Sequence, residues 1–388
     1  MESGYFHQLS AALRQAGYFR PALVIDRDRL DRNIARLLKG LGPQTRLRIV
    51  DKSLPSLGLI RHVLEATGAR AIMTFHLPIT RAVLEAFPGV DALLGKPMPV
   101  EAAEQFLTGL DAAARLSAAG RITWLIDTAE RLDAYAALAS RLLITLNIAF
   151  EVDIGVRRGG VQTPEELSLL LDRARRQAGI AVRGLMGYEA HIPAMPALAG
   201  GPGAEQARVI RRFQSFVDCL RQDERAILNT GGSKTALIYG SGHAANELST
   251  GSALLLPSDF DTPALKDFEP AAFIATPALK VGPARLPGPD FLPRLLQAFG
   301  RFPRRACYIY GGAWMARPVF PEGLRENALW GRSSNQQFLG MDDRTELNPG
   351  DTVFLRPTQS EAVLQQFGPI AVFSEGRIVE EWLPVPPG

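Results

Sequence analysis

Lys52 combines a residue type and a position that suit covalent chemistry on a carbonyl compound. It ends the strand-like run of residues 46–52, in the segment Arg48-Ile49-Val50-Asp51-Lys52-Ser53. Most lysines are solvated surface residues, but one at the end of a buried strand loses part of its hydration. Desolvation lowers the pKa of the ammonium group and leaves a neutral amine that attacks an aldehyde. The sequence therefore predicts that Lys52 holds a carbonyl compound covalently.

Two glycine-containing turns provide the chemistry of a phosphate site. Residues 229–235 follow an apolar run and contain a glycine pair, and residues 247–252 contain a second turn. Such turns expose backbone N–H groups that can surround phosphate oxygens. A single turn of this kind is common, but two in one chain favour a bound phosphate. The candidate binding residues are Asn229, Thr230, Gly231, Gly232, Ser249, Gly251 and Ser252.

Other apolar runs also end in polar side chains. They end at Asp127, at Glu151 with Asp153, and at the segment from Tyr188 to His191. Asp127 is equally well explained as a helix cap, whereas tyrosine and histidine are not typical caps. Barrel enzymes carry their chemistry at the carboxyl ends of strands, so this recurrence predicts a site there.

The elements that must position these residues alternate between short apolar runs and helical periodicity. Strands are predicted at 46–52, 70–75, 91–95, 122–127, 146–154, 182–190, 226–231 and 247–256. Helices are predicted at 30–41, 60–66, 99–116, 129–142, 164–178 and 204–220. Eight repeated βα units predict an α/β fold, a closed (β/α)₈ TIM-type barrel over residues 27–260.

The sequence changes character after about residue 257. Residues 282–293 contain four prolines, and short strands separated by turn residues are predicted at 307–310, 352–356, 370–373 and 377–382. Residues 22–26 form a further strand-like run that has no place in the barrel. We therefore predict a second, C-terminal β-domain made of residues 1–26 and 261–388, with residues 22–26 paired to its sheet.

Composition excludes several classes of protein. Hydrophobic residues make up 46% and charged residues 21%, which is typical of a globular protein. The net charge is only +3 and the arginine pairs are scattered, so no nucleic-acid partner is expected. The two cysteines are far apart and have no metal-ligand spacing. No apolar segment reaches the roughly 18 residues of a membrane span, and residues 1–20 lack a secretory pattern, so a cytoplasmic protein without a membrane partner is expected.

Several of these motifs together resemble a known family. The segment Pro21-Ala22-Leu23-Val24-Ile25-Asp26 and the Lys52 segment are similar to D-threonine aldolase and D-serine dehydratase-like proteins. These proteins are relatives of alanine racemase with fold type III binding of pyridoxal 5'-phosphate (PLP), and the resemblance covers nearly the whole chain. It implies PLP as the cofactor, held as an imine on Lys52 with its phosphate at the two glycine turns.

The resemblance also implies roles for residues around the cofactor ring. Arg158, in residues 151–161, matches an arginine near the phenolic oxygen of PLP, and its neighbour Arg157 is expected to face solvent. Tyr188 and His191 match a motif in which an aromatic ring or imidazole packs on the pyridine. Ser249 stands where alanine racemases have an arginine beside the ring nitrogen. This departure weakens the resemblance to a racemase, because a protonated ring withdraws electrons more strongly.

The metal motif of the family is divergent in this chain. Metal-using relatives bind a divalent ion through a histidine and a cysteine or aspartate near the C-terminus, where this chain has Gln359 and Glu361. A neutral glutamine is a poor zinc ligand, although its carbonyl and a carboxylate can hold a harder ion such as magnesium or manganese. Metal dependence is therefore left open. Glu361 is expected to act as an ion ligand or a proton-transfer group.

The resemblance implies an enzyme that acts on a small amino acid as a homodimer. The first expectation is a PLP-dependent lyase that acts on a D-3-hydroxy amino acid through an external aldimine, by retro-aldol cleavage or dehydration. The first alternative is an amino acid racemase with Lys52 as one base. The second is a PLP-binding protein without turnover, which the presence of a complete β-domain disfavours.

Overall fold

The computed structural model describes residues 3–42, 45–240, 242–289, 291–361 and 363–385. These residues form two compact units. The barrel unit contains the described residues of 34–253 and 262–267 together with residue 385. The β-unit contains those of 1–33, 254–261 and 268–384.

Within the described residues, eight parallel strands close into the predicted (β/α)₈ barrel. Strand β9 pairs with β2 and so closes the barrel, with Arg46 opposite Glu247. Each strand overlaps one of the eight predicted runs. The strands are β2 (Arg46–Val50), β3 (Ala71–Thr74), β4 (Asp91–Leu94), β5 (Ile122–Ile126), β6 (Leu146–Val152), β7 (Ile180–Gly187), β8 (Ile227–Thr230) and β9 (Glu247–Thr250).

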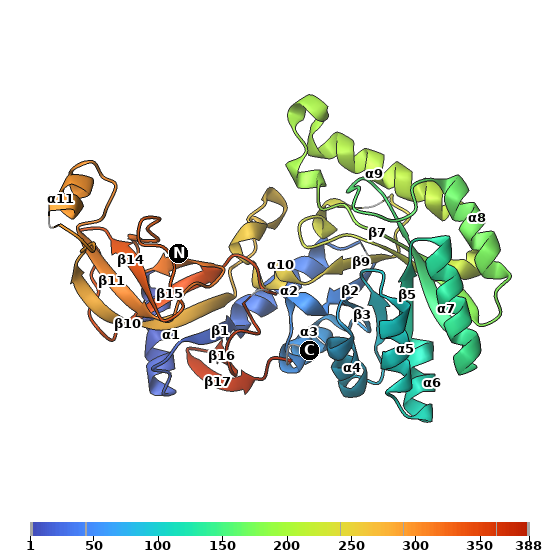
Figure 1. The fold of residues 1–388 in the computed structure, drawn as a ribbon, viewed down its shortest axis with the longest axis horizontal. Coiled ribbons are helices and arrows are strands. Elements are labelled where there is room, and N and C mark those ends of the chain that lie inside the picture. The colour runs from blue at the N-terminus through green and yellow to red at the C-terminus, as the bar shows by residue number, and fades with distance from the viewer. Residues whose placement is uncertain (1–2, 43–44, 241, 290, 362, 386–388) are drawn as a thin grey trace. The chain divides into compact units, whose positions relative to one another are not determined.

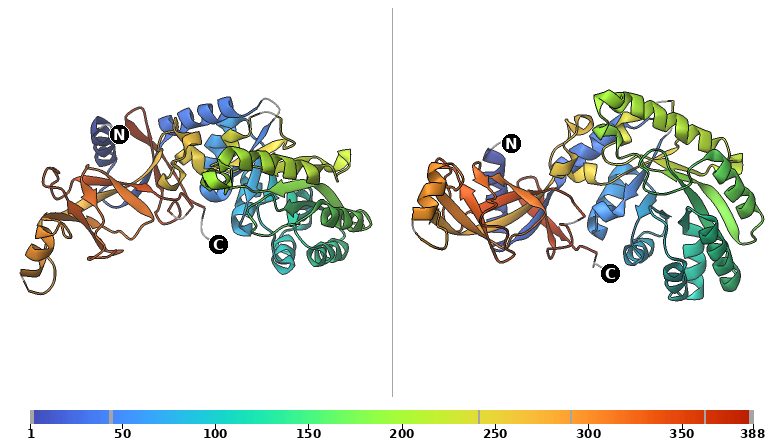
Figure 2. Two further views of the ribbon diagram at one scale, coloured as in Figure 1. Left: turned by 90° about the horizontal axis from the view of Figure 1, so that it is seen from above. Right: turned by 45° about the horizontal axis from the view of Figure 1, so that its top comes forward.

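Helices lie around the outside of the barrel strands (Figures 1 and 2). They are α3 (Leu57–Thr67), α4 (Leu77–Ala86), α5 (Val100–Thr108), α6 (Ala112–Arg121), α7 (Ala129–Leu142), α8 (Pro164–Arg175) and α9 (Gly201–Val217). Helix α2 (Arg27–Gly40) crosses the boundary between the units. The prediction of one periodic segment over 99–116 is wrong. The Asp111 carboxylate accepts from the Ala114 N–H at 2.8 Å and starts a new helix there.

A charged pair buried in the barrel unit joins β2 to β9. The guanidinium of Arg48 is fully buried and donates to Glu247 through Nε at 2.7 Å and Nη2 at 2.9 Å. Its Nη1 also donates to Asp91 on β4, at 2.6 Å. Two parallel hydrogen bonds between a guanidinium and a carboxylate fix the relative position of both groups. Arg48 therefore holds in register the two strands that end at the Lys52 segment and at the second glycine turn.

The β-unit contains a sheet of nine strands among the described residues, ordered β13-β14-β11-β10-β1-β16-β17, with β15 paired to β10 and β12. Strand β1 (Ala22–Asp26) pairs with β10 and β16, which confirms the predicted pairing of residues 22–26. The other strands are β10 (Ala272–Pro283), β11 (Arg305–Tyr310), β12 (Ala316–Phe320), β13 (Leu324–Arg325), β14 (Gln336–Met341), β15 (Thr352–Pro357), β16 (Ile370–Ser374) and β17 (Arg377–Trp382).

Three helices in the β-unit were not predicted: α1 (Ser3–Gln15), α10 (Ser252–Leu255), which crosses the unit boundary, and α11 (Phe291–Ala298). Helix α1 buries Phe6 and Leu9 in a core shared with Phe273 and Phe354 of the sheet. Along the described parts of the chain, no helix is both long enough and apolar enough to cross a membrane.

Candidate active site

Lys52 lies at the carboxyl end of β2, as the sequence predicts. It occupies a one-turn 3₁₀ helix, η1 (Asp51–Ser53), and its side chain is half-buried. The Lys52 Nζ atom lies 5.1 Å from the ring centroid of Phe75, which follows β3. An aromatic face beside the amine excludes water on that side. Lys52 is therefore partly desolvated at the end of the barrel that carries the other strand-end residues.

The second glycine turn packs directly against the turn that carries Lys52. The Ser252 hydroxyl donates to the Ser53 hydroxyl at 2.9 Å. A Cβ atom on Gly251 would lie 2.7 Å from the backbone oxygen of Val50 and 2.9 Å from Cβ of Ser53. Only glycine fits at this position, because both distances are shorter than a van der Waals contact. The sequence motif at Gly251 thus marks a close approach of two backbones.

The first glycine turn joins the same group of residues. The Gly251 N–H donates to the Ser233 hydroxyl at 3.2 Å, and this hydroxyl is 3.1 Å from that of Thr250. Gly231 has a φ of +89°, in the left-handed region that favours glycine. A Cβ atom on Gly232 would lie 2.8 Å from the ring of Tyr188. The two glycine turns are therefore adjacent, with Tyr188 beside the first of them.

Arg158 extends this set on the side of Tyr188. Its guanidinium carbon lies 5.1 Å from the centroid of the Tyr188 ring, within the range of a cation–π contact. Desolvation raises the pKa of nearby Glu151, and the charge of Arg158 acts in the opposite direction. The structure thus links Lys52, the two glycine turns, Tyr188 and Arg158 through a continuous series of contacts, although they are spread over more than 200 residues of sequence.

Glu189, which follows β7, anchors the first glycine turn, a role that the sequence does not predict. Its carboxylate accepts from the hydroxyls of Thr230 and Thr235, each at 2.6 Å, and from the N–H of Gly231 at 3.3 Å. Complete burial raises the pKa of Glu189, and these hydrogen bonds oppose the rise. A carboxylate at a strand end opposite a turn rich in donors is the sequence feature that identifies this role.

Asn229 and Ser249, both predicted to bind cofactor, are hydrogen-bonded to each other. The Ser249 hydroxyl donates to the Asn229 carbonyl at 3.0 Å, and the Asn229 amide donates to Glu247 at 3.3 Å. All three side chains are buried. They continue the network of Arg48, so the polar groups below the glycine turns have fixed partners and fixed orientations.

His191 contacts helix α9. Its Nε2 atom lies 2.8 Å from Oε1 of Glu205 on that helix. A Cβ atom on Gly155 would lie 2.7 Å from the same nitrogen, so the imidazole also packs on the loop that leads to Arg158. His191 thus lies between this loop and α9. Its packing on the cofactor ring stays a prediction.

Asp51, next to Lys52, is a second residue whose environment the sequence does not predict. Its carboxylate is fully buried, and neither oxygen completes a hydrogen bond of regular geometry with the described residues. Burial raises the pKa of Asp51 to about 7, against the smaller opposing effects of the Thr74 hydroxyl, the Lys52 N–H and the Lys52 charge. An aspartate that ends an apolar strand beside a candidate nucleophile is the feature that identifies it.

We expect the Asp51→Asn variant to change how stability depends on pH. Because the folded-state pKa is raised above the unfolded one, the folded chain binds more protons between those values. Stability is therefore lost as the pH rises through about 7. Asparagine does not ionise, so the variant does not lose this stability. As the pH rises from about 5 to about 8, its free energy of unfolding should increase by roughly 3 kcal/mol relative to that of wild type.

Denaturant unfolding of the cofactor-containing protein at several pH values measures this difference. Asp218→Asn is the matched control, because Asp218 is exposed. A difference in free energy of unfolding between Asp51→Asn and wild type that does not vary with pH would contradict a raised pKa of Asp51.

Gln359 and Glu361 belong to the β-unit. The Gln359 amide donates to Asp259 at 3.3 Å, and the Ser360 hydroxyl donates to Glu361 at 3.2 Å. In the portion of the chain that the structure describes, no cluster of three or more His, Cys, Asp or Glu residues has the arrangement of a metal site. A metal role for Gln359 and Glu361 stays a prediction.

The residues of the barrel unit fit PLP. A half-buried lysine amine suits the aldehyde, and glycine turns in which a Cβ atom would collide with neighbouring groups suit close approach of a phosphate. Arg158 supplies a cation for an anionic ring oxygen, and Tyr188 supplies an aromatic face. Lys52, Arg158, Tyr188 and the two glycine turns are the residues that would hold the cofactor.

Comparison with known proteins agrees with this arrangement. The sequence profile described as alanine racemase, N-terminal domain, matches residues 25–259. No curated protein matches the chain.

Among solved structures, the chain is similar to D-threonine aldolase from Filomicrobium marinum, with 19% identity, a TM-score of 0.75 and 94% of each chain covered. It is also similar to D-threo-3-hydroxyaspartate dehydratase from Delftia sp. HT23, with 18% identity, a TM-score of 0.73, and 95% of this chain and 98% of that chain covered.

An alanine racemase from Bacillus anthracis has 14% identity and a TM-score of 0.70, with 94% of this chain and 97% of that chain covered. At these identities the structural matches establish the fold alone. The profile, by contrast, covers more than half of the chain and includes Lys52 and both glycine turns. The chain therefore belongs to the family defined by the N-terminal domain of alanine racemase, whose members are fold type III PLP-dependent enzymes.

Proposed function

We propose that this protein is a PLP-dependent lyase that holds its cofactor on Lys52 and acts on a small D-3-hydroxy amino acid. The observation that carries the proposal is the convergence of Lys52 and both glycine turns at one end of the barrel. When bound, PLP withdraws electrons from the bonds at the amino acid Cα. The remaining roles fall to side chains of this chain.

The half-buried Lys52 amine would anchor the cofactor. Once the substrate has displaced this amine from the cofactor, the amine would move a proton at the substrate. Arg158 would stabilise negative charge on the ring oxygen. Glu189 would keep the first glycine turn in the conformation that receives phosphate, through its bonds to Thr230, Thr235 and Gly231. Ser249 would present a neutral hydroxyl to the cofactor ring, in contrast to the arginine of alanine racemases.

Aldol cleavage or dehydration is our first choice of reaction. The similar structures include an enzyme named for D-threonine cleavage and one named for 3-hydroxyaspartate dehydration. Racemisation is the second candidate, favoured by the similar alanine racemases and by the description of the matching profile. The neutral Ser249 argues against it, because an arginine beside the ring nitrogen limits carbanion lifetime in those enzymes.

A substrate panel separates these reactions. The yellow, cofactor-loaded protein is incubated with D- and L-amino acids, with and without Mg²⁺, Mn²⁺ or Zn²⁺, and the products are separated on a chiral column. A lyase yields an aldehyde with glycine, or a keto acid with ammonia, and a racemase yields the enantiomer. Lack of any product from a fully loaded protein would favour cofactor binding without turnover and would refute the lyase proposal.

Glu361→Gln tests the role proposed for the C-terminal carboxylate. We expect turnover to fall roughly 100-fold, as for loss of a proton-transfer group or an ion ligand, with little change in the unfolding midpoint. Tightly bound zinc is not expected, since an amide oxygen and one carboxylate form a weak zinc site. Glu346→Gln is the control, because Glu346 is an exposed glutamate of the same unit. Unimpaired turnover in Glu361→Gln would refute the catalytic role of Glu361. Stoichiometric zinc by elemental analysis would refute the expectation of a weak zinc site.

The proposed homodimer and cytoplasmic location rest on the resemblance and on composition. Size-exclusion chromatography with light scattering measures the oligomeric state, and cell fractionation measures the location. A monomer that is fully active would refute the dimer.

A further inference from the structure

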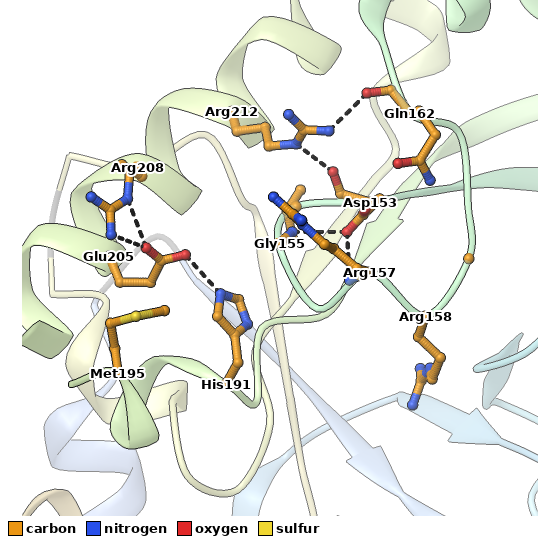
Figure 3. A pocket seen from close by; sticks show the side chains of 12 residues that line it. Asp153, Gly155, Arg157, Arg158, Gln162, His191, Met195, Glu205, Arg208 and Arg212 are labelled. Atoms are coloured by element: carbon orange, nitrogen blue, oxygen red, sulfur yellow. Dashed lines mark hydrogen bonds and ion pairs between the residues drawn. The ribbon is translucent and has the colours of Figure 1, made fainter. Parts of the chain in front are cut away.

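A pocket lies between the loop after β6 and helix α9 (Figure 3). Its volume is about 930 Å³. Arg158 and His191 line it, so the pocket shares two residues with the site proposed above. Among the residues that the structure describes, none from the two glycine turns lines the pocket. The pocket is therefore separate from the place proposed for the cofactor phosphate.

The lining of this pocket is rich in arginine. It contains Arg157, Arg158, Arg208 and Arg212, against the two acids Asp153 and Glu205. Both acids already have partners. The Glu205 carboxylate accepts from His191 and, at 2.7 Å, from Nε of Arg208. Desolvation raises the pKa of Glu205, but the hydrogen bonds from His191 and Arg208 outweigh it and lower the pKa. The carboxylate is therefore ionised, and its negative charge is balanced by these neighbours.

The second acid is used by the backbone. The Asp153 carboxylate accepts from the N–H groups of Gly155 and Arg157, at 2.9 and 3.0 Å. Among the described residues, neither Arg157 nor Arg212 has a carboxylate within ion-pair distance. The pocket therefore carries uncompensated positive charge within a concave surface, where it attracts anions more strongly than on a flat surface.

Arg157 is held in an unfavourable backbone conformation. Its φ is +56°, in the left-handed region that arginine seldom adopts and that costs on the order of 1 kcal/mol. The bond from its N–H to Asp153 stabilises this conformation. In Figure 3 the Arg157 side chain lies beside Asp153 and Gly155, whereas the Arg158 side chain points away from Arg157. The expectation that Arg157 merely faces solvent is incomplete, since its exposed side chain lines the pocket.

Arg212 is positioned by neutral partners. Its guanidinium donates to the backbone oxygens of Asp153 and Gln162, at 2.5 and 2.8 Å. These bonds orient the planar group without cancelling its charge. A guanidinium fixed in this way loses little conformational freedom when it binds a carboxylate or phosphate.

We propose that this arginine pocket binds the anionic side-chain group of the amino acid substrate, with Arg157 and Arg212 as its cationic contacts. The group is a carboxylate or a phosphate. The substrate assignment rests on the function proposed above, because Arg158 and His191 line the pocket and are also candidate residues of the active site. Anion binding itself depends only on the charges and the cavity.

The test measures anion binding to protein loaded with PLP, so that the cofactor phosphate occupies its own site. Isothermal titration calorimetry uses succinate, inorganic phosphate and the neutral succinamide, in a buffer without other multivalent anions. Arg157→Asn removes the charge while keeping a residue type that tolerates left-handed φ. Arg157→Lys retains the charge. Arg211→Gln is the matched control on α9, since Arg211 is exposed and is not part of the lining.

We expect succinate or phosphate to bind and succinamide not to bind. Arg157→Asn should weaken binding about tenfold, as for loss of one charged contact, whereas Arg157→Lys and Arg211→Gln should stay close to wild type. Tighter binding of succinate indicates an acidic amino acid, and tighter binding of phosphate indicates a phosphorylated one. In turnover assays, the preference for anionic over neutral amino acids should fall by a similar factor in Arg157→Asn.

Equal binding of succinate and succinamide, or equal anion binding by Arg157→Asn and Arg211→Gln, would overturn the inference. Failure of the proposed function has a different signature. In that case the PLP-loaded protein would release neither an aldehyde nor a keto acid in the substrate panel, and the Arg157 variants would still decide whether the pocket binds anions.

Discussion

Lys52→Ala is expected to lose the covalently held cofactor and to lower turnover by roughly 100- to 10,000-fold, the range for removal of a catalytic acid–base group. The physical reason is that Lys52 would serve twice, as the anchor of the aldehyde and as a proton carrier at the substrate. Folding should change little, because its half-buried side chain lies at the end of β2 and not within the strand. Visible absorbance and borohydride reduction measure the bound cofactor, an activity assay measures turnover, and denaturant unfolding measures folding.

Lys39→Ala is the control for this experiment, since Lys39 is exposed on α2. In wild type, borohydride followed by peptide mapping should place the reduced adduct on Lys52. An adduct on another lysine, or a Lys52→Ala variant that keeps a reducible cofactor, would show that the anchor is elsewhere.

The second large effect is expected at Gly251. In Gly251→Ala, the new Cβ atom would lie 2.7 Å from the backbone oxygen of Val50, so β2 and the second glycine turn must separate. Such overpacking costs about 1–3 kcal/mol and moves the Lys52 turn away from the phosphate site. We expect a melting temperature lower by several degrees and cofactor retention reduced at least about tenfold. Gly251→Asp should release the cofactor further, because a carboxylate would then face the phosphate.

Gly120→Ala provides the matched control. A Cβ atom on Gly120, in helix α6, would meet no atom within 4 Å, so this variant should be as stable as wild type or more stable. Gly231→Asp is a second test of the phosphate site. A Cβ atom there would press mainly on the Leu248 side chain, and the φ of +89° adds backbone strain. Wild-type cofactor retention after dialysis in both Gly251→Ala and Gly231→Asp would refute the phosphate assignment.

The elements of the barrel could be predicted from local sequence alone. Buried parallel strands are apolar on both faces, so runs such as Ile122–Ile126 stand out between amphipathic helices. The C-terminal sheet was harder to predict. Its longest strand, Ala272–Pro283, contains internal proline and glycine, which indicate a loop in a sequence, but it lies in the middle of the sheet, between β1, β11 and β15.

The sequence by itself determined the residue types of the site and their positions at strand ends. A lysine after a buried strand and a glycine pair after another are each common, and it is their occurrence together with a second glycine turn that predicts the site. The reason that Gly251 must be glycine was not predictable, since the backbone that excludes a side chain there belongs to Val50, about 200 residues away in sequence.

Only the tertiary structure decided which side chains act together. Burial of Asp51, the bonds of Glu189 to the first glycine turn, and the arginine pocket all depend on contacts between distant segments. Arg157 and Arg212 are 55 positions apart, and a sequence cannot show that a left-handed backbone and a neighbouring helix aim both guanidinium groups at one cavity. Desolvation and charge compensation are properties of the packed chain, so they follow from the fold and not from residue order.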